Sequence, residues 1–165
     1  MKVFISWSGE QGRALAEIIH RWLPSVIQSL IPYFSPDDVP MGARWSTEIA
    51  TELESSDVGL IIVTRDALRA PWLMFEAGAL SKNVGRARVS PLLFNLEPAE
   101  IEGPLVQFQA ARFEKTEIKR VMRMINSELG DSALSNDILE GSFEIWWPRL
   151  EQAVRAELER AGRQT

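Results

Sequence analysis

An aromatic side chain and a carboxylate stand four positions apart in the middle of the chain, at Trp72 and Glu76. The apolar, β-branched run at 58–64 predicts a buried strand, and 71–80 predicts a helix with one inward stripe. Pro71 suits the first position of that helix, where its missing N–H costs nothing. Residues four apart lie on one side of a helix, so Glu76 is expected one turn beyond the Trp72 ring. A carboxylate held in this way could stabilise developing positive charge or hold hydroxyl groups.

The composition narrows what such a site can do. The chain has 165 residues, of which 45% are apolar, enough for one domain with a real core. Because the chain has no cysteine, we expect no disulfide and no thiolate metal site, and the single histidine, His20, excludes multi-histidine metal chemistry within one chain. A net charge of −5 without a basic run argues against nucleic acid as a direct partner. No stretch reaches the roughly 20 apolar residues of a membrane span and no signal peptide opens the chain, so we expect a cytoplasmic protein without membrane contact.

Strand-like and helix-like segments alternate along the sequence. Strands are expected at residues 2–6, 31–34, 58–64, 88–94 and 106–113, and helices at 14–23, 45–53, 71–80, 116–129 and 138–158. This order predicts an α/β fold, namely a flavodoxin-like five-stranded parallel sheet (order 2-1-3-4-5) with helices on both faces, plus a C-terminal helix. We expect one unit at 1–130 and a helical extension at 131–165 packed on the same domain.

Two prolines are expected to bend helices: Pro24 ends or kinks the first, and Pro148 kinks the last. The inward side of the last helix is predicted to carry Ile138, Leu139, Phe143, Trp147, Leu150, Val154 and Leu158.

The loops of this sheet define where a ligand would bind. Parallel sheets bind ligands beyond the carboxyl ends of their strands, where the order of strands reverses. The first and third strands would be neighbours, so the connectors 7–12 and 65–70 would flank a crevice. A long loop at 35–44, rich in proline, aspartate and glycine, would close it.

Three motifs in this order resemble the Toll/interleukin-1 receptor (TIR) domain, specifically its bacterial branch. The strand at 3–8, which ends in Ser-x-Ser, is similar to the first box of the family. The loop at 35–44 stands where the family has its BB loop, although here Ser35-Pro36 precedes the acids. The stretch 71–76 matches the W-x-x-x-E motif of TIR domains that cleave NAD. The resemblance covers about residues 1–130 well, and 143–150 resembles the last helix of many bacterial members.

The resemblance implies an NAD+ nucleosidase with Glu76 as its catalytic residue. Nicotinamide leaves NAD+ as a neutral molecule, so the reaction needs no general acid, and one carboxylate beside the ribose can suffice. The products would be nicotinamide and ADP-ribose or a cyclic isomer, with NAD+ as substrate and no cofactor. The family places such enzymes in antiphage defence. Glu76 could instead be a solvated acid or one that interacts with the helix dipole.

Further residues are predicted to contact the substrate. They are Ser6, Trp7, Ser8, Met41, Arg44, Trp45, Trp72 and Phe75. Each has a structural alternative: the serines can form an ordinary turn, the aromatic residues can belong to the core, and Arg44 can be a solvated charge.

The residues alone do not decide between this enzyme and other functions, nor do they identify the partners of the chain. The family resemblance implies self-association through the 35–44 loop, and a separate sensor or effector protein is a further candidate partner. Phe143, Trp146 and Trp147 could form a partner surface, but closing the core is the favoured interpretation. The chain could alternatively be a non-catalytic TIR interaction module, although such a module does not need Glu76. A nucleoside or nucleotide transferase is a third hypothesis.

Overall fold

A five-stranded parallel sheet forms the centre of the molecule. The computed structural model describes residues 1–7, 9–34, 56–65, 88–101 and 109–163. Its strands are β1 (Lys2–Ser6), β2 (Ile31–Phe34), β3 (Val58–Val63), β4 (Val89–Leu93) and β5 (Ala111–Arg112). All pairs are parallel, in the order β2-β1-β3-β4-β5. The predicted fold class and strand order are therefore confirmed.

The inner strands are buried on both faces. Successive side chains of a strand point to opposite faces, yet Val3, Phe4 and Ile5 of β1 are all fully buried. All six residues of β3 are buried as well, and Ile5 pairs with Leu60 across the β1–β3 ladder. Near-continuous apolar runs of this kind are typical of the inner strands of parallel sheets. The burial predicted for β3 from its sequence is confirmed.

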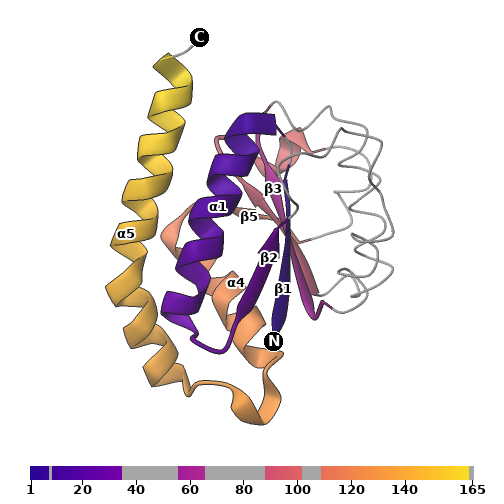
Figure 1. Cartoon of the computed structure of the whole chain (residues 1–165), viewed down its shortest axis with the longest axis vertical. Helices are drawn as coiled ribbons and strands as arrows, with labels where there is room; N and C mark the ends of the chain where they lie inside the picture. The colour runs from indigo at the N-terminus through magenta and orange to yellow at the C-terminus, as the bar shows by residue number, and fades with distance from the viewer. Residues whose placement is uncertain (8, 35–55, 66–87, 102–108, 164–165) are drawn as a thin grey trace.

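Three long helices are described, and they lie on one side of the sheet (Figure 1). They are α1 (Gly9–Val26), α4 (Lys115–Ser127) and α5 (Asn136–Arg163). Helices α1 and α5 run side by side in opposite directions (Figure 1). Short 3-10 turns occur at Pro98–Glu100 and Gly130–Ser132. The helices predicted at 45–53 and 71–80 fall outside the described residues.

Several predicted boundaries and one core residue need correction. Helix α1 begins at Gly9, so the connector after β1 is shorter than 7–12, and the helix continues through Pro24. Of the described residues in the predicted strand 106–113, only Ala111 and Arg112 pair with β4. Ile138 was expected to face inward but is 60% exposed. Neighbouring positions on a helix differ by about 100°, so Ile138 points away from the stripe that Leu139 begins.

Helix α5 is fixed to α1 by hydrogen bonds and ring contacts. Trp22 Nε1 donates to the carbonyl oxygen of Trp146 at 2.9 Å, and Ser142 Oγ donates to that of Val26 at 2.8 Å. Phe143 and Trp147 of α5 are buried in the same core as the inner strands. The core role favoured for these two aromatic residues is confirmed, whereas Trp146 is only half-buried.

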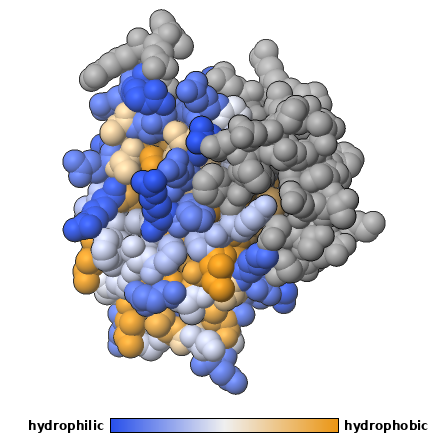
Figure 2. All heavy atoms as spheres, viewed as in Figure 1, coloured by the Kyte–Doolittle hydropathy of each residue, from blue (hydrophilic) through white to orange (hydrophobic). Residues whose placement is uncertain are grey.

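The described surface has an uneven distribution of apolar side chains. On the face drawn in Figure 2, the most hydrophobic residues gather toward the lower part of the view and hydrophilic ones are more frequent toward the upper part. Among the described residues, the exposed large apolar side chains are Ile31, Ile138 and Ile145. Within the same ranges, no helix has the length and apolar character needed to cross a bilayer.

Two glycines are expected to respond oppositely to alanine. Gly130 follows α4 with φ at +58°, a conformation that disfavours a Cβ atom, whereas Gly141 lies inside α5 with open space around it. We expect Gly130→Ala to lower the free energy of unfolding by about 1 kcal/mol and Gly141→Ala to raise it by about 0.5–1 kcal/mol. Urea denaturation of both variants measures this difference, and changes of the same sign would contradict it.

Candidate functional site

The carboxyl ends of β1 and β3 lie next to each other at the centre of the sheet. Ser6 pairs with Ile61, and Thr64 follows the end of β3. The side chains of Ser6 and Thr64 are 0% and 2% exposed, so neither hydroxyl lies on the surface. Trp7 is half-buried and packs against the core. A ligand at this edge would contact the carboxyl ends of the strands and the segments that follow them.

The chain turns sharply from β1 into α1. Gly9 has φ at +72°, which glycine adopts without the steric cost that a Cβ atom would add. A Cβ atom built at Gly12 would lie 3.7 Å from Cβ of Trp7, so the first turn of α1 lies close to that tryptophan. The amino end of an 18-residue helix is thereby placed at the carboxyl edge of the sheet.

A guanidinium group links the ends of β3 and β4. Arg65 Nη2 donates to the carbonyl oxygen of Asn95 at 2.9 Å, and Arg65 Nη1 donates to Glu100 Oε1 at 2.9 Å. Asn95 has φ at +58°, and asparagine is among the residues that tolerate this region. The other oxygen of Glu100 accepts a hydrogen bond from the backbone N–H of Glu97 at 2.7 Å. This backbone hydrogen bond, together with Arg65, lowers the pKa of Glu100.

A second network closes the β5 end of the same edge. The guanidinium of Arg112 contacts Glu117 at 2.8 Å, Glu97 at 3.2 Å and Glu114 at 3.3 Å. Burial raises the pKa of Glu117, but the hydrogen bonds from the backbone N–H and guanidinium of Arg112 outweigh it, so the pKa is lowered overall. Among the described residues, no group of three acidic or histidine side chains is placed to hold a metal ion.

The Arg112–Glu117 pair makes a pH-dependent contribution to stability. Because the pKa of Glu117 is lowered in the folded state, its stabilisation is present above the ordinary pKa of a carboxyl and is lost as the pH falls through the lowered value. We expect Glu117→Gln to destabilise the protein by up to about 1 kcal/mol at neutral pH, and by less in acid. Urea denaturation across the acidic range tests this, with the exposed Glu159→Gln as control. A deficit that stays constant with pH would contradict it.

The predicted site is described only in part. Of the residues expected to bind or convert a substrate, the structure places Ser6 and Trp7 at the carboxyl edge of the sheet. The others lie outside the described residues, and their roles stay predictions: Ser8, Met41, Arg44, Trp45, Trp72, Phe75 and Glu76. The closing loop at 35–44 also falls outside them.

The sequence alone did not identify Arg65, Asn95 or Glu100 as residues of this edge. Arg65 stood in the predicted connector 65–70, and the other two stood between the strands predicted at 88–94 and 106–113. An asparagine directly after an apolar strand and shortly before a proline is a turn signal that could have drawn attention to Asn95.

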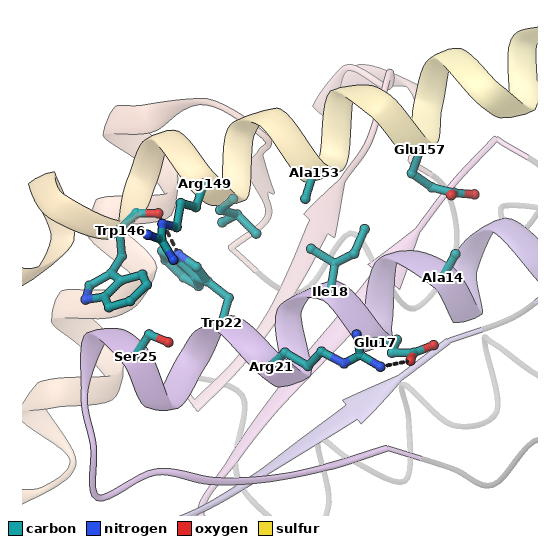
Figure 3. Close-up of a pocket in the computed structure, with 11 residues that line it drawn as sticks. Ala14, Glu17, Ile18, Arg21, Trp22, Ser25, Trp146, Arg149, Ala153 and Glu157 are labelled. Atoms are coloured by element: carbon teal, nitrogen blue, oxygen red, sulfur yellow. Dashed lines mark hydrogen bonds and ion pairs between the residues drawn. The ribbon is translucent and has the colours of Figure 1, made fainter.

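A separate groove lies between α1 and α5, and residues of both helices line it (Figure 3). It has a volume of about 480 Å³. Its apolar floor includes Ile18 and Ala153, and the guanidinium of Arg149 lies 4.9 Å from the centre of the Trp146 ring. Arg21 on the α1 side is paired with Glu17 at 2.6 Å. Neither Ser6 nor Trp7, the two described residues that were predicted to bind substrate, is among the residues that line the groove.

Comparison with known proteins identifies the family. The model of the TIR domain family matches residues 3–125, which is most of the chain. The protein therefore belongs to the TIR domain family, and α5 lies beyond the matched segment. Among curated proteins, none matches this sequence.

The fold was also compared with solved structures. One similar structure is that of the TIR domains in the activated Roq1 resistosome directly recognizing the pathogen effector XopQ. The likeness covers 97% of this chain and 98% of that one, with 13% sequence identity and a TM-score of 0.48. At these values the Roq1 TIR domains give no information about the activity of this chain.

Proposed function

We propose that this TIR domain is an NAD+ nucleosidase of the bacterial branch of the family. The observation that carries the proposal is Glu76, which stands four residues after Trp72 in a chain of the TIR family. This is the W-x-x-x-E spacing of TIR domains that cleave NAD. Both residues follow β3 in the sequence, and β3 is the central strand of the sheet.

Cleavage of the nicotinamide–ribose bond requires one correctly positioned carboxylate and no general acid. The bond between ribose and nicotinamide breaks with its electron pair passing to the positively charged ring nitrogen, so nicotinamide leaves neutral. Positive charge then develops on the ribose, where the Glu76 carboxylate stabilises it or holds the ribose hydroxyls. Water completes hydrolysis to ADP-ribose, whereas attack by an internal nucleophile gives a cyclic isomer. Trp72 stacks on a flat ring or keeps water from the site.

Assembly is part of the proposal. We infer that copies associate through the 35–44 loop, which completes the site between subunits, so that isolated monomers are nearly inactive. The proposed role is in antiphage defence, where loss of NAD+ or a cyclic nucleotide signal follows infection. A separate sensor or effector protein would then act with this chain.

The deciding experiment is a chromatographic assay of nicotinamide release from NAD+. It is run at high protein concentration or on a crowding matrix, since a dilute sample tests only the monomer. Release that rises more steeply than protein concentration supports an assembled enzyme. No release in any assembled state would overturn the proposal and favour the non-catalytic interaction module. The product profile separates hydrolysis, cyclisation and transfer.

A further inference from the structure

We infer that Arg65 binds the diphosphate of the substrate, and that Glu100 competes for its guanidinium when the site is empty. This inference rests on the proposed function, because it assigns a further substrate-binding residue to the same site. It is drawn from the described residues at the carboxyl ends of β3 and β4. A dinucleotide such as NAD+ carries two negative charges on its diphosphate, so an accessible cation at the edge that binds it would stabilise the complex.

The two arginines described at the ends of β3 and β5 differ in the number of carboxylates that they contact and in the exposure of their side chains. Arg112 contacts three carboxylates, and its side chain is 38% exposed. Among the described residues Arg65 contacts one carboxylate, that of Glu100, and its side chain is 66% exposed. Arg65 also follows the central strand, next to the end of β1, whereas Arg112 ends an edge strand. Arg65 is therefore the better placed of the two to meet a ligand.

The contacts of Arg65 suit an exchange of partners. Its pair with Glu100, itself 38% exposed, is an exposed ion pair of the kind that contributes little to stability. The hydrogen bond to the carbonyl oxygen of Asn95 can hold one side of the guanidinium in place while the other side changes partner. A phosphate accepts two parallel hydrogen bonds from arginine, which a single carboxylate oxygen does not match. The bound diphosphate thus replaces Glu100.

If the diphosphate replaces Glu100, substitutions of Arg65 and of Glu100 should change the affinity for the ligand in opposite directions. Arg65→Gln removes the cation, so we expect the dissociation constant for ADP-ribose and the KM for NAD+ to rise about tenfold, the scale of one charge-assisted hydrogen bond. Glu100→Gln removes the competitor, so both constants should fall, by about two- to fivefold given how weak exposed ion pairs are. Binding of adenosine, which has no phosphate, should change with neither variant. Calorimetry and initial rates measure these constants.

A matched control tests whether the effect belongs to this edge. Arg88 pairs with Glu128 at 2.9 Å and stands before β4, at the amino end of the sheet. Arg88→Gln removes the same charge and should leave both constants unchanged. Circular dichroism and denaturation of each variant show whether it is folded, and Arg65→Lys, which keeps the charge but not the fork, should lie between wild type and Arg65→Gln.

The outcomes separate this inference from the proposed function. If wild type releases nicotinamide and Arg65→Gln leaves the KM and the ADP-ribose affinity unchanged, the inference is wrong and the function stands. If no variant releases nicotinamide but ADP-ribose binding weakens in Arg65→Gln and tightens in Glu100→Gln, the function is wrong and the inference stands. A wild-type protein that does not bind ADP-ribose at all would also overturn the inference.

Discussion

Replacing Glu76 with alanine should lower the rate of nicotinamide release by at least about 100-fold, the scale seen when one preorganised group that stabilises a transition state is removed. The reason lies in the proposed reaction, in which the leaving group needs no proton and the carboxylate acts on the charge that develops on the ribose. Because this charge is small in the ground state, the loss should fall mainly on kcat, with a modest change in KM. Initial rates at high protein concentration measure both.

Two further variants make the Glu76 result specific. Glu76→Gln keeps the size and removes the charge, so it should be as inactive as Glu76→Ala if charge stabilisation dominates. A glutamine that retains most of the activity would indicate that holding the ribose hydroxyls is the main role. Glu151→Ala is the matched control, because Glu151 is a half-buried glutamate of α5 whose one ion pair among the described residues is with Arg155 of the same helix. Equal release from wild type and Glu76→Ala would remove Glu76 from the mechanism.

The sheet could be predicted from the sequence because its strands are dictated by local composition. The run at 58–64 consists mostly of apolar residues, many of them β-branched, and the structure buries all six residues of β3. The order of strands then followed from the alternation with helices and the right-handed crossover rule. Segments with a weaker pattern were less well predicted. Strand β5 comprises Ala111 and Arg112 only. Ile138 is exposed because it lies one position before Leu139, and one position on a helix is enough to turn a side chain away from the buried stripe.

The sequence predicted that the candidate site lies at the carboxyl edge of the sheet, but it did not predict which residues contact one another there. The bridge from Arg65 to Asn95 and Glu100 joins residues that are 30 and 35 positions apart in the chain. A pairing of this kind depends on the neighbouring positions of β3 and β4 and on the left-handed backbone at Asn95. None of these features leaves a periodic signal in the sequence. By contrast, Glu76 could be singled out from the sequence because it belongs to a local motif, W-x-x-x-E, in which it follows Trp72 by four positions. This motif carries the resemblance to the family.

Phe143→Ala should lower the free energy of unfolding by about 3–5 kcal/mol, the usual cost of truncating a buried phenylalanine. The Phe143 ring is 0% exposed and lies between α1, α4 and α5. It stacks on Trp147 with centroids 5.7 Å apart, meets the edge of Trp22 at 6.1 Å, and has Lys119 Nζ 5.5 Å from its centre. Truncation leaves a cavity at the contact that attaches α5, a helix outside the segment matched by the TIR family.

The same variant tests whether α5 belongs to the folding unit of the sheet. If the helix and the sheet unfold together, Phe143→Ala should shift the whole urea transition, followed both by tryptophan fluorescence and by circular dichroism, to lower concentration without splitting it. Ile145→Ala is the control, because Ile145 lies two residues further along α5 and is 70% exposed. Its change should stay within about 0.5 kcal/mol. Two separate transitions in Phe143→Ala, the first losing only helix, would show instead that α5 is an appendage whose packing on α1 adds nothing to the stability of the sheet.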